Sequence, residues 1–351
     1  MVISHLNLDR ILRKTVPVIV FLLLVYGSFL YSYYICWNEI YHHHSKSTGI
    51  GLIIGNILFI LLIYFIWLQM FLVGPGFQPH VPIYKFYEDY RDDYESIPPP
   101  DYFICTQDGY PIYCTMCQSI KIDRSRHSGD FGKCIGRFDH FCYWIGTVIG
   151  KQNYRLFMQF LIWFQLYFVY SIVTTSVFIK DIYRRRNNSL HPQIIVLYIL
   201  LAFWLVIVFA LFVSHVYYLW INITSIEEIK IKQHRRDKTP DPQAFINFKH
   251  KGERYVLRYS SLKDHIWNRG LHENWIQVMG KSVFFWFVPW RGPINDPHSG
   301  DLKEQDYYVI VGDYFEEISD KFKQHFIERI ERKDYESKFT MGCSDVGSSD
   351  V

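Results

Sequence analysis

Four residues whose side chains bind zinc lie close together near the middle of the 351-residue chain. Cys114 and Cys117 are spaced as Cys-x-x-Cys, and His127 and Cys134 follow them. One tight turn can bring both thiolates of such a pair onto a single ion, and three sulfurs with one imidazole complete a closed tetrahedral zinc site. The spacing therefore predicts one structural zinc ion with these four ligands, rather than a chance cluster.

A second group, Asp139, His140 and Cys142, begins five residues after the last of these ligands. In an extended segment, residues i and i+2 project to the same side, so the imidazole of His140 can take the proton of the Cys142 thiol. Asp139 can then hold the ring by its other nitrogen. The alternative, that His140 or Cys142 is a further metal ligand, is weaker because four ligands already close the predicted site. We expect Cys142 to be a catalytic nucleophile, His140 its base and Asp139 the residue that orients the base.

Long apolar segments lie on both sides of these two groups. None of the segments contains Asp, Glu, Lys or Arg, and each reaches the roughly 20 residues of helix that cross a bilayer. Core helices of soluble proteins are rarely that long. The predicted transmembrane spans are residues 16–37, 50–73, 156–179 and 193–220. The sequence thus indicates an α-helical multispan membrane protein, with a small zinc-stabilised, cysteine-rich module over residues 104–155 between spans two and three.

The distribution of charge predicts which segments face the cytosol. A net charge of +3 is too small to indicate binding to nucleic acid. Three Lys and Arg residues precede the first span, nine lie between the second and third and twenty follow the fourth, against one and four in the two remaining loops. The positive-inside rule then places both termini and the module in the cytosol, although Lys180 and residues 184–186 depart from it. Cytosolic thiols stay reduced, so the clustered cysteines are expected to bind metal or to react.

The remaining segments carry less specific patterns. Residues 1–15 form a cytosolic head with the composition of an interfacial turn, and prolines with an acidic run predict an exposed linker over residues 77–103. Residues 221–351 form a cytosolic tail. Its basic start either attracts anionic headgroups or is a solvated face. Near its end, apolar residues at helical spacing predict an amphipathic helix that packs against the rest of the tail; they are Ile318, Phe322, Phe326 and Ile330.

The module resembles a known family. Residues 113–157 read YCTMCQSIKIDRSRHSGDFGKCIGRFDHFCYWIGTVIGKQNYRLF, which is similar to the cysteine-rich domain of the Asp-His-His-Cys (DHHC) palmitoyltransferases. Gly74-Pro75-Gly76 resembles the family's Asp-Pro-Gly motif, residues 224–227 resemble its Thr-Thr-x-Glu motif, and residues 274–280 resemble its C-terminal Asn-x5-Gly motif. An aromatic residue in the third position of Asp-His-Phe-Cys is similar to the fungal branch called palmitoyltransferase five.

The resemblance implies a difference in metal content. Family members bind two zinc ions, and the ligands of the first match the four residues named above. The positions of the second set hold Ser128, Phe131, Phe141 and Val148. Phenyl and isopropyl groups cannot coordinate a metal, so we expect a single zinc ion, with the last three side chains forming an apolar cluster in place of the second. Other departures lie beside the nucleophile, at Tyr143, Gly146 and Thr147.

The resemblance also implies a two-step reaction of a protein S-acyltransferase. Cys142 would attack the thioester of palmitoyl-CoA or a similar acyl-CoA, and the acyl-enzyme would pass its chain to an accessible cysteine of a membrane-associated protein. Each buried methylene contributes about 0.8 kcal/mol, so a long acyl chain favours a hydrophobic cavity among the spans. Lys133, Arg137, Lys151 or the basic run after the fourth span could contact the phosphates of coenzyme A.

Two other classes of function fit parts of the sequence. A catalytically silent membrane adaptor, whose zinc module only docks partners, is favoured by the missing second metal and by Tyr143. It does not explain why Asp139, His140 and Cys142 occur together. A small transporter or channel lacks the ionisable residues inside the spans that mark a pathway. The protein substrates, the preferred chain length, the cellular membrane and the oligomeric state stay open, as do the roles of Cys36, Cys105 and Cys343.

Overall fold

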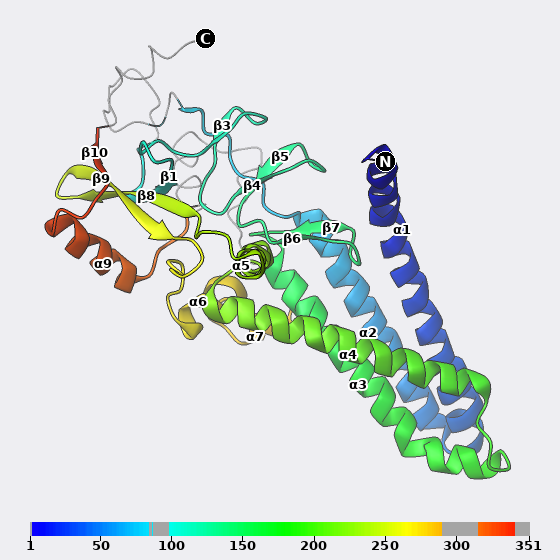
Figure 1. Cartoon of the computed structure of the whole chain (residues 1–351). Coiled ribbons are helices and arrows are strands. Elements are labelled where there is room, and N and C mark those ends of the chain that lie inside the picture. The colour runs from blue at the N-terminus through cyan, green and yellow to red at the C-terminus, as the bar shows by residue number, and fades with distance from the viewer. Residues whose placement is uncertain (1, 84–85, 87–97, 290–314, 341–351) are drawn as a thin grey trace, which may run out of the picture.

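The structure, a computed structural model, describes residues 2–83, 86, 98–289 and 315–340. Figure 1 shows a bundle of long helices and, at one end of it, a smaller region of short strands and helices. The chain passes twice through the bundle, forms most of the small strands, returns for two more passes and ends in the small region. Of the predicted linker over residues 77–103, residues 84–85 and 87–97 lie outside the described residues, and so does Cys343.

The bundle consists of four helical segments. The first is α1 (Val2–Phe29), continued by the π-helix η1 (Leu30–Tyr41), and the others are α2 (Lys46–Val73), α3 (Tyr154–Arg185) and α4 (Pro192–Ile221). By length and composition all four can cross a membrane, which indicates a multi-pass membrane protein. Each contains one predicted apolar segment and extends beyond it. The head is not a separate turn, because α1 runs unbroken over residues 2–29.

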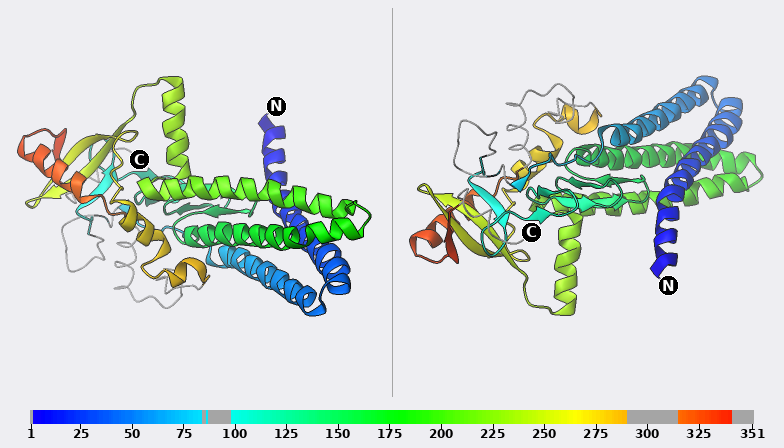
Figure 2. Two further views of the ribbon diagram at one scale, coloured as in Figure 1. Left: turned by 90° about the horizontal axis from the view of Figure 1, so that it is seen from below. Right: turned by 90° about the horizontal axis from the view of Figure 1, so that it is seen from above.

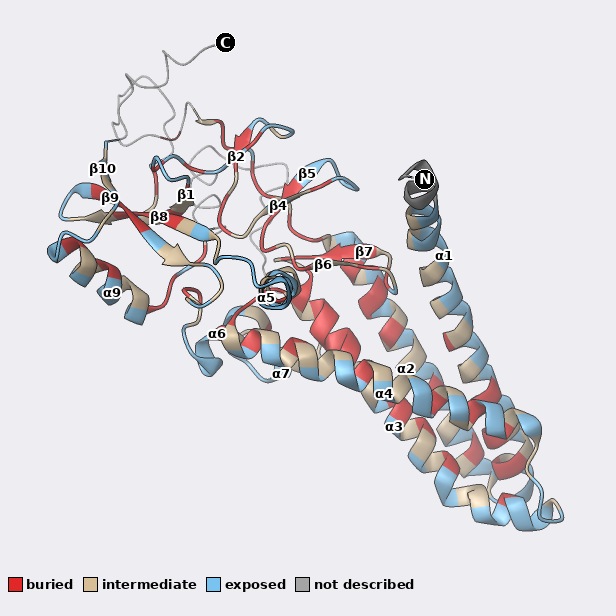
Figure 3. Ribbon diagram, in the orientation of Figure 1, coloured by how far each residue is buried: buried red, intermediate tan, exposed pale blue. Residues whose placement is uncertain are grey.

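Many residues on the outward faces of the bundle are exposed (Figure 3), and large hydrophobic side chains are among them. Leu58, Leu72 and Val206 expose 62%, 71% and 69% of their surface. A soluble protein rarely exposes an apolar area of this extent, whereas hydrocarbon would cover it at no cost. The exposure therefore supports the assignment of these helices as membrane spans.

Several polar and charged side chains inside the bundle are paired with one another. Asn56 is fully buried and donates hydrogen bonds to the hydroxyls of Ser28 and Ser32 at 2.7 and 2.8 Å. Glu39, on η1 and 2% exposed, forms ion pairs with Arg185 and Arg186. Two of the arginines that depart from the positive-inside pattern are thus paired with a buried carboxylate.

Three small hairpins form the cysteine-rich region between α2 and α3. They pair β2 (Tyr113–Cys114) with β3 (Ser119–Ile120), β4 (Arg126–Ser128) with β5 (Lys133–Ile135), and β6 (His140–Cys142) with β7 (Thr147–Ile149). Each hairpin is antiparallel and closed by a short connection. Because strands this short bury little apolar surface, the hairpins depend on contacts with the rest of the chain.

The tail forms the second part of the small region. Its sheet has the order β1-β8-β9-β10, built from β1 (Tyr102–Cys105), β8 (Gln243–His250), β9 (Glu253–Ser260) and β10 (Ser337–Phe339). Helix α9 (Asp320–Glu331) buries Phe326 and Ile330 against this sheet, which confirms the predicted amphipathic helix. Residues 102–105, two of which we predicted to begin the cysteine-rich module, pair instead with β8 of the tail.

Three further short helices lie in the described tail between α4 and residue 289: α5 (Ser225–Asp237), α6 (Leu271–Met279) and α7 (Phe284–Phe287). Asn222, whose backbone is left-handed, caps the C-terminal end of α4. Thr224 and Glu227 form a capping box at the start of α5, which follows after only three residues. Figure 2 shows that α5 and the N-terminal part of α1 project from the same side of the molecule.

A buried polar network joins the cysteine-rich region to the tail. Arg124, whose side chain is 3% exposed, donates to the carboxylate of Glu227 at 2.7 Å and to the amide oxygen of Asn222 at 2.9 Å. Arg137 donates to the same oxygen of Asn222 at 2.8 Å. The buried carboxylate of Glu316 lies within 4.0 Å of both guanidinium groups. The network therefore fixes the hairpins relative to the start of α5.

Arg124→Met is expected to destabilise the chain, because it removes the cation paired with Glu227 and one of the two guanidinium donors to Asn222. Removing one partner of a buried ion pair costs about 3–5 kcal/mol, and the partial exposure of Glu227 places the effect near the lower end. Thermal unfolding in detergent measures it. The control is Arg126→Met, which removes the same charge at an exposed position over the ring of Phe138. Equal unfolding midpoints for the two variants would contradict the role of the network.

Candidate functional site

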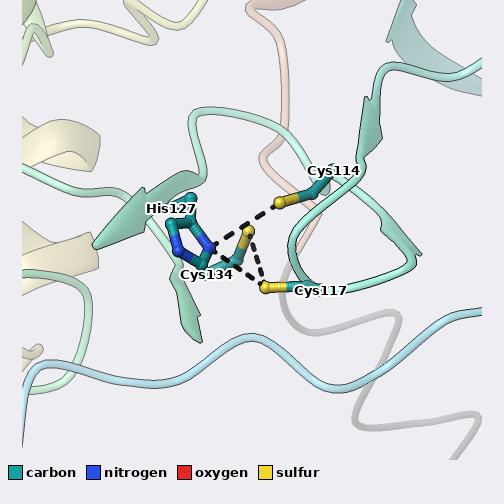
Figure 4. Close-up of side chains that lie close together, drawn as sticks. All are labelled: Cys114, Cys117, His127 and Cys134. Carbon is teal, nitrogen blue, oxygen red and sulfur yellow. Dashed lines mark hydrogen bonds between the residues drawn. The ribbon is translucent and has the colours of Figure 1, made fainter. Parts of the chain in front are cut away.

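The four predicted metal ligands converge in one cluster (Figure 4). Cys114 and Cys117 come from the β2–β3 hairpin, whose turn is closed by the left-handed residue Gln118. His127 and Cys134 are register partners on β4 and β5. Register partners in an antiparallel pair project to the same face, so His127 and Cys134 lie together on the face of the β4–β5 hairpin that is next to Cys114 and Cys117.

The distances in the cluster fit a tetrahedral ion. Cys117 Sγ lies 3.2 Å from His127 Nδ1 and 3.7 Å from Cys134 Sγ, and Cys114 Sγ lies 3.7 Å from the same ring nitrogen. All four ligand atoms are within 4.8 Å of one another. Sulfurs at about 2.3 Å from a tetrahedral zinc are separated by roughly 3.8 Å, so the cluster needs little movement to hold the ion.

The second predicted group is also brought together. His140 and Cys142 are the ends of the strand β6, so their side chains project to the same side. His140 Nδ1 is 2.6 Å from Asp139 Oδ2. Asp139 is fully buried and accepts further hydrogen bonds from the backbone N–H and the hydroxyl of Ser225, at 2.8 and 2.5 Å. The carboxylate is thereby fixed from two sides.

The surroundings favour a charged imidazole. Burial opposes the charge on His140, but hydrogen bonds with Asp139 and Cys142 outweigh it and raise the pKa of His140 to about 9. Burial also opposes the charge on Asp139, and by itself it would raise the pKa of this carboxyl group. The hydrogen bond and charge of His140 and the hydroxyl of Ser225 outweigh burial and keep the pKa of Asp139 below its ordinary value. A carboxylate on Asp139 and an imidazolium on His140 are therefore the favoured protonation states near neutral pH.

Three residues of this site were missed by the sequence patterns. Ser225 holds Asp139, His215 lies with its ring centre 5.6 Å from that of His140, and a hydrogen bond of 2.8 Å joins Tyr154 Oη to His215 Nδ1. Asp139, His140 and His215 lie close enough to hold a metal ion. Their polar atoms already engage one another, Ser225 and Tyr154, so we interpret them as a hydrogen-bonded network. The isolated His215 inside an apolar segment was the available signal.

Cys142 faces an apolar cavity on the side of β6 towards the bundle. The cavity lies between α1, α3, α4 and the β6–β7 hairpin, and its lining includes Leu24, Phe160, Phe164 and Leu201. Cys142 itself is 7% exposed. The connection after β6 is fixed to the bundle by Trp67, whose indole donates to the carbonyl of Ile145 at 3.0 Å.

Two expectations need correction. Arg137 is 5% exposed and engaged with Asn222 and Glu316, so it is not placed to contact a phosphate in solution. The expected apolar cluster forms only in part. Phe141 and Val148 are register partners, whereas Phe131 packs on Phe77 and stays 39% exposed.

Four membrane-type helices with a cysteine- and histidine-bearing module between the second and third are the arrangement expected of a DHHC domain. A family model described as DHHC palmitoyltransferase matches residues 108–232, which include the module, α3, α4 and the start of α5. This match agrees with the family expected from the motifs.

Curated relatives extend the likeness to most of the chain. It is 32% identical over 345 residues to palmitoyltransferase PFA5 of Kluyveromyces lactis, covering 94% of this chain and 95% of that protein. It is 34% identical over 334 residues to palmitoyltransferase PFA5 of Candida glabrata, and the match covers 92% of both proteins. It is 31% identical over 346 residues to palmitoyltransferase PFA5 of Saccharomyces cerevisiae, again with 92% of both proteins covered. The chain therefore belongs to the DHHC palmitoyltransferase family, in its PFA5 branch, and is a protein S-palmitoyltransferase.

Elemental analysis of the purified chain is expected to give one metal ion per molecule. Cys117→Ser should lose that ion and lower the thermal unfolding midpoint, because the binding free energy of a structural ion is also folding free energy, about 10 kcal/mol or more in small zinc modules. Cys105→Ala is the control, since Cys105 is buried but lies outside the cluster. Two ions per chain, or a full ion in Cys117→Ser, would contradict the assignment.

Proposed function

We propose that this palmitoyltransferase works through an acyl-enzyme on Cys142, formed from palmitoyl-CoA or a similar acyl-CoA. One observation carries the proposal: the thiol that lies beside His140 also lines an apolar cavity among the helices. A nucleophile with a proton partner on one side and a hydrophobic cavity on the other suits a reaction between a thioester and a long alkyl chain.

The cavity suits an acyl chain in length and polarity. On α3 its lining extends over the twelve residues from Phe157 to Phe168, a length of helix of about 16 Å. Trp144 and Trp204 meet edge to face with ring centres 5.5 Å apart, and both line the cavity with Cys142. Each methylene transferred from water contributes about 0.8 kcal/mol, so the chain has a strong preference for this space.

The arrangement of Asp139, His140 and Cys142 supports a two-step transfer, in which the His140 ring first takes the proton of the Cys142 thiol. The Cys142 thiolate attacks the thioester carbon, the bond to the coenzyme A sulfur breaks, and the imidazolium of His140 gives its proton to the leaving thiolate. The acyl-enzyme carries no charge on sulfur, which removes one of the interactions that raise the pKa of His140. The neutral ring then takes the proton of a substrate thiol, whose thiolate attacks the acyl carbon and releases Cys142.

We assign a structural role to a zinc ion on Cys114, Cys117, His127 and Cys134. The donor set of three sulfurs and one ring nitrogen suits zinc and leaves no open position for a reacting water. Held there, the ion ties the β2–β3 hairpin to the β4–β5 hairpin. The substrate thiol and the acyl group then react on the neighbouring β6–β7 hairpin.

The orientation of the chain is part of the proposal. Both termini and the cysteine-rich module lie in the cytosol, which follows from the excess of Lys and Arg in those segments. The pairing of Arg185 and Arg186 with Glu39 removes part of the conflict with this orientation. The protein substrates are membrane-associated, because their cysteines must reach a thiol at the end of a helical bundle embedded in lipid.

Incubation with palmitoyl-CoA is expected to add one palmitoyl group to the peptide that contains Cys142, and hydroxylamine should release it, because it cleaves thioesters. Mass spectrometry of that peptide is the measurement. Cys142→Ser should abolish both this adduct and transfer to substrate while keeping the metal and the unfolding midpoint, and Cys36→Ala should retain activity. Turnover by Cys142→Ser would refute the nucleophile assignment.

The rate of acyl-enzyme formation is expected to fall as the pH rises through about 9, because the imidazolium of His140 is present below its raised pKa and lost above it. Asp139→Asn removes the charge that stabilises the imidazolium, so the alkaline limb should move to lower pH and the rate at neutral pH should fall about 100-fold. Single-turnover rates across pH measure both effects. Asp108→Asn, at an exposed position, is the control, and an unchanged alkaline limb in Asp139→Asn would contradict the mechanism.

A further inference from the structure

One face of the N-terminal part of α1 lies against the hairpin that carries Cys142. Asp9, Arg13 and Pro17 are spaced four residues apart, so they share one side of the helix. We call these three residues the clamp face. In Figure 1 this end of α1 stands beside β6 and β7, beyond the point where α1 joins the other helices.

Each residue of the clamp face contacts the β6–β7 hairpin or its neighbour. The guanidinium of Arg13 lies 4.2 Å from the ring centre of Phe141 and forms an ion pair with Asp130. The hydroxyl of Tyr143 donates to the carboxylate of Asp9, which also accepts from Arg13 at 2.7 Å. These contacts include residues on both sides of Cys142 in the sequence.

The turn of the hairpin is shaped to the same helix. Gly146 has a φ of +88°, and a Cβ at this position would lie 2.8 Å from Cγ of Pro17. A larger residue would be strained and would also push α1 away. Tyr143 and Gly146, two of the departures from the family pattern, are therefore both accounted for by contact with the clamp face.

Arg13 also connects the β4–β5 hairpin to the β6–β7 hairpin, a connection that the metal cluster does not make. All four cluster residues lie on the β2–β3 and β4–β5 hairpins. Asp130 belongs to the turn of the β4–β5 hairpin and Phe141 to β6, and the guanidinium contacts both. A planar cation can pair with a carboxylate and stack on an aromatic face at once, which Lys does less well.

The same helix forms part of the cavity wall. Val20 and Leu24, one and two turns beyond Pro17, line the cavity together with Cys142. The clamp face and this part of the cavity wall belong to one helix, α1. The contacts between α1 and the β6–β7 hairpin therefore determine where the Cys142 thiol lies relative to the cavity.

We propose that the clamp face, with Arg13 at its centre, is a positioning element that holds the Cys142 hairpin at the cavity for acyl transfer. The proposal rests on the proposed function, since it assumes the acyl-enzyme on Cys142. Arg13 acts through Phe141, Tyr143 and Asp130, and touches neither the acyl group nor the thiol.

The test compares Arg13→Gln with Lys14→Gln, which removes the same charge from the exposed side of the same turn. Single-turnover formation of the Cys142 thioester is measured over a range of palmitoyl-CoA concentrations. We expect Arg13→Gln to slow the saturated rate roughly tenfold, since small misplacements of reacting groups cost one to two orders of magnitude. The half-saturating concentration, the metal content and the unfolding midpoint should stay unchanged, and Lys14→Gln should match the wild type.

Two further variants separate positioning from folding. Tyr143→Phe removes only the hydrogen bond to Asp9 and should slow the saturated rate severalfold with the metal retained. The combination of Arg13→Gln with Asp130→Asn should be no slower than Arg13→Gln alone, because partners in one interaction are not additive. Equal rates in Arg13→Gln, Tyr143→Phe and the wild type would overturn the inference, as would a slow rate accompanied by loss of metal. A wild-type chain that forms no thioester on Cys142 would overturn the proposed function and the inference with it.

Discussion

The buried carboxylate of Asp139 is the constraint on which the arrangement of the site depends. A charge without access to water must be paired and hydrogen-bonded, and here the partners are the next residue, His140, at the start of β6 and Ser225 in the first turn of α5. The backbone N–H of Ser225 has no partner inside its own helix, so the carboxylate satisfies it while the N-terminal end of the helix stabilises the negative charge. The position of α5 and the position of the β6–β7 hairpin therefore depend on each other. A shift of either would leave the buried carboxylate of Asp139 without a hydrogen-bond partner.

The three hairpins of the cysteine-rich region are fixed by different means. The first two share the ligands of one metal cluster, whereas the β6–β7 hairpin lies between α5, which holds Asp139, and α1, which contacts Phe141 and Tyr143. Trp67 of α2 fixes its turn. The hairpin of Cys142 is thus held by α1, α2 and α5, and α1 also lines the cavity. A shift of these helices would move the Cys142 thiol without altering the ligands of the metal cluster.

In the proposed reaction, Cys142 lies where the polar groups of the site meet the apolar cavity. His140 and Cys142 project to the same side of β6. The carboxylate of Asp139 is fully buried, which strengthens its electrostatic interaction with the His140 ring. Aromatic and aliphatic side chains line the cavity beside the thiol, so the proposed proton transfers and the acyl chain would meet at the same sulfur atom.

The four long apolar helices, the cluster of Cys114, Cys117, His127 and Cys134, and the placement of His140 beside Cys142 could all be predicted from the sequence. Each of these follows from a pattern that is repeated or completed within a few tens of residues. Only the tertiary structure decided that Ser225 meets Asp139, that Arg137 is buried in a polar network, that Phe131 packs on Phe77, and that Arg13 meets Phe141. Several of these contacts join residues some 50 to 130 positions apart, and they depend on how helices and hairpins pack. Spacing along the chain predicts local geometry, but it carries no information about which distant surfaces come into contact.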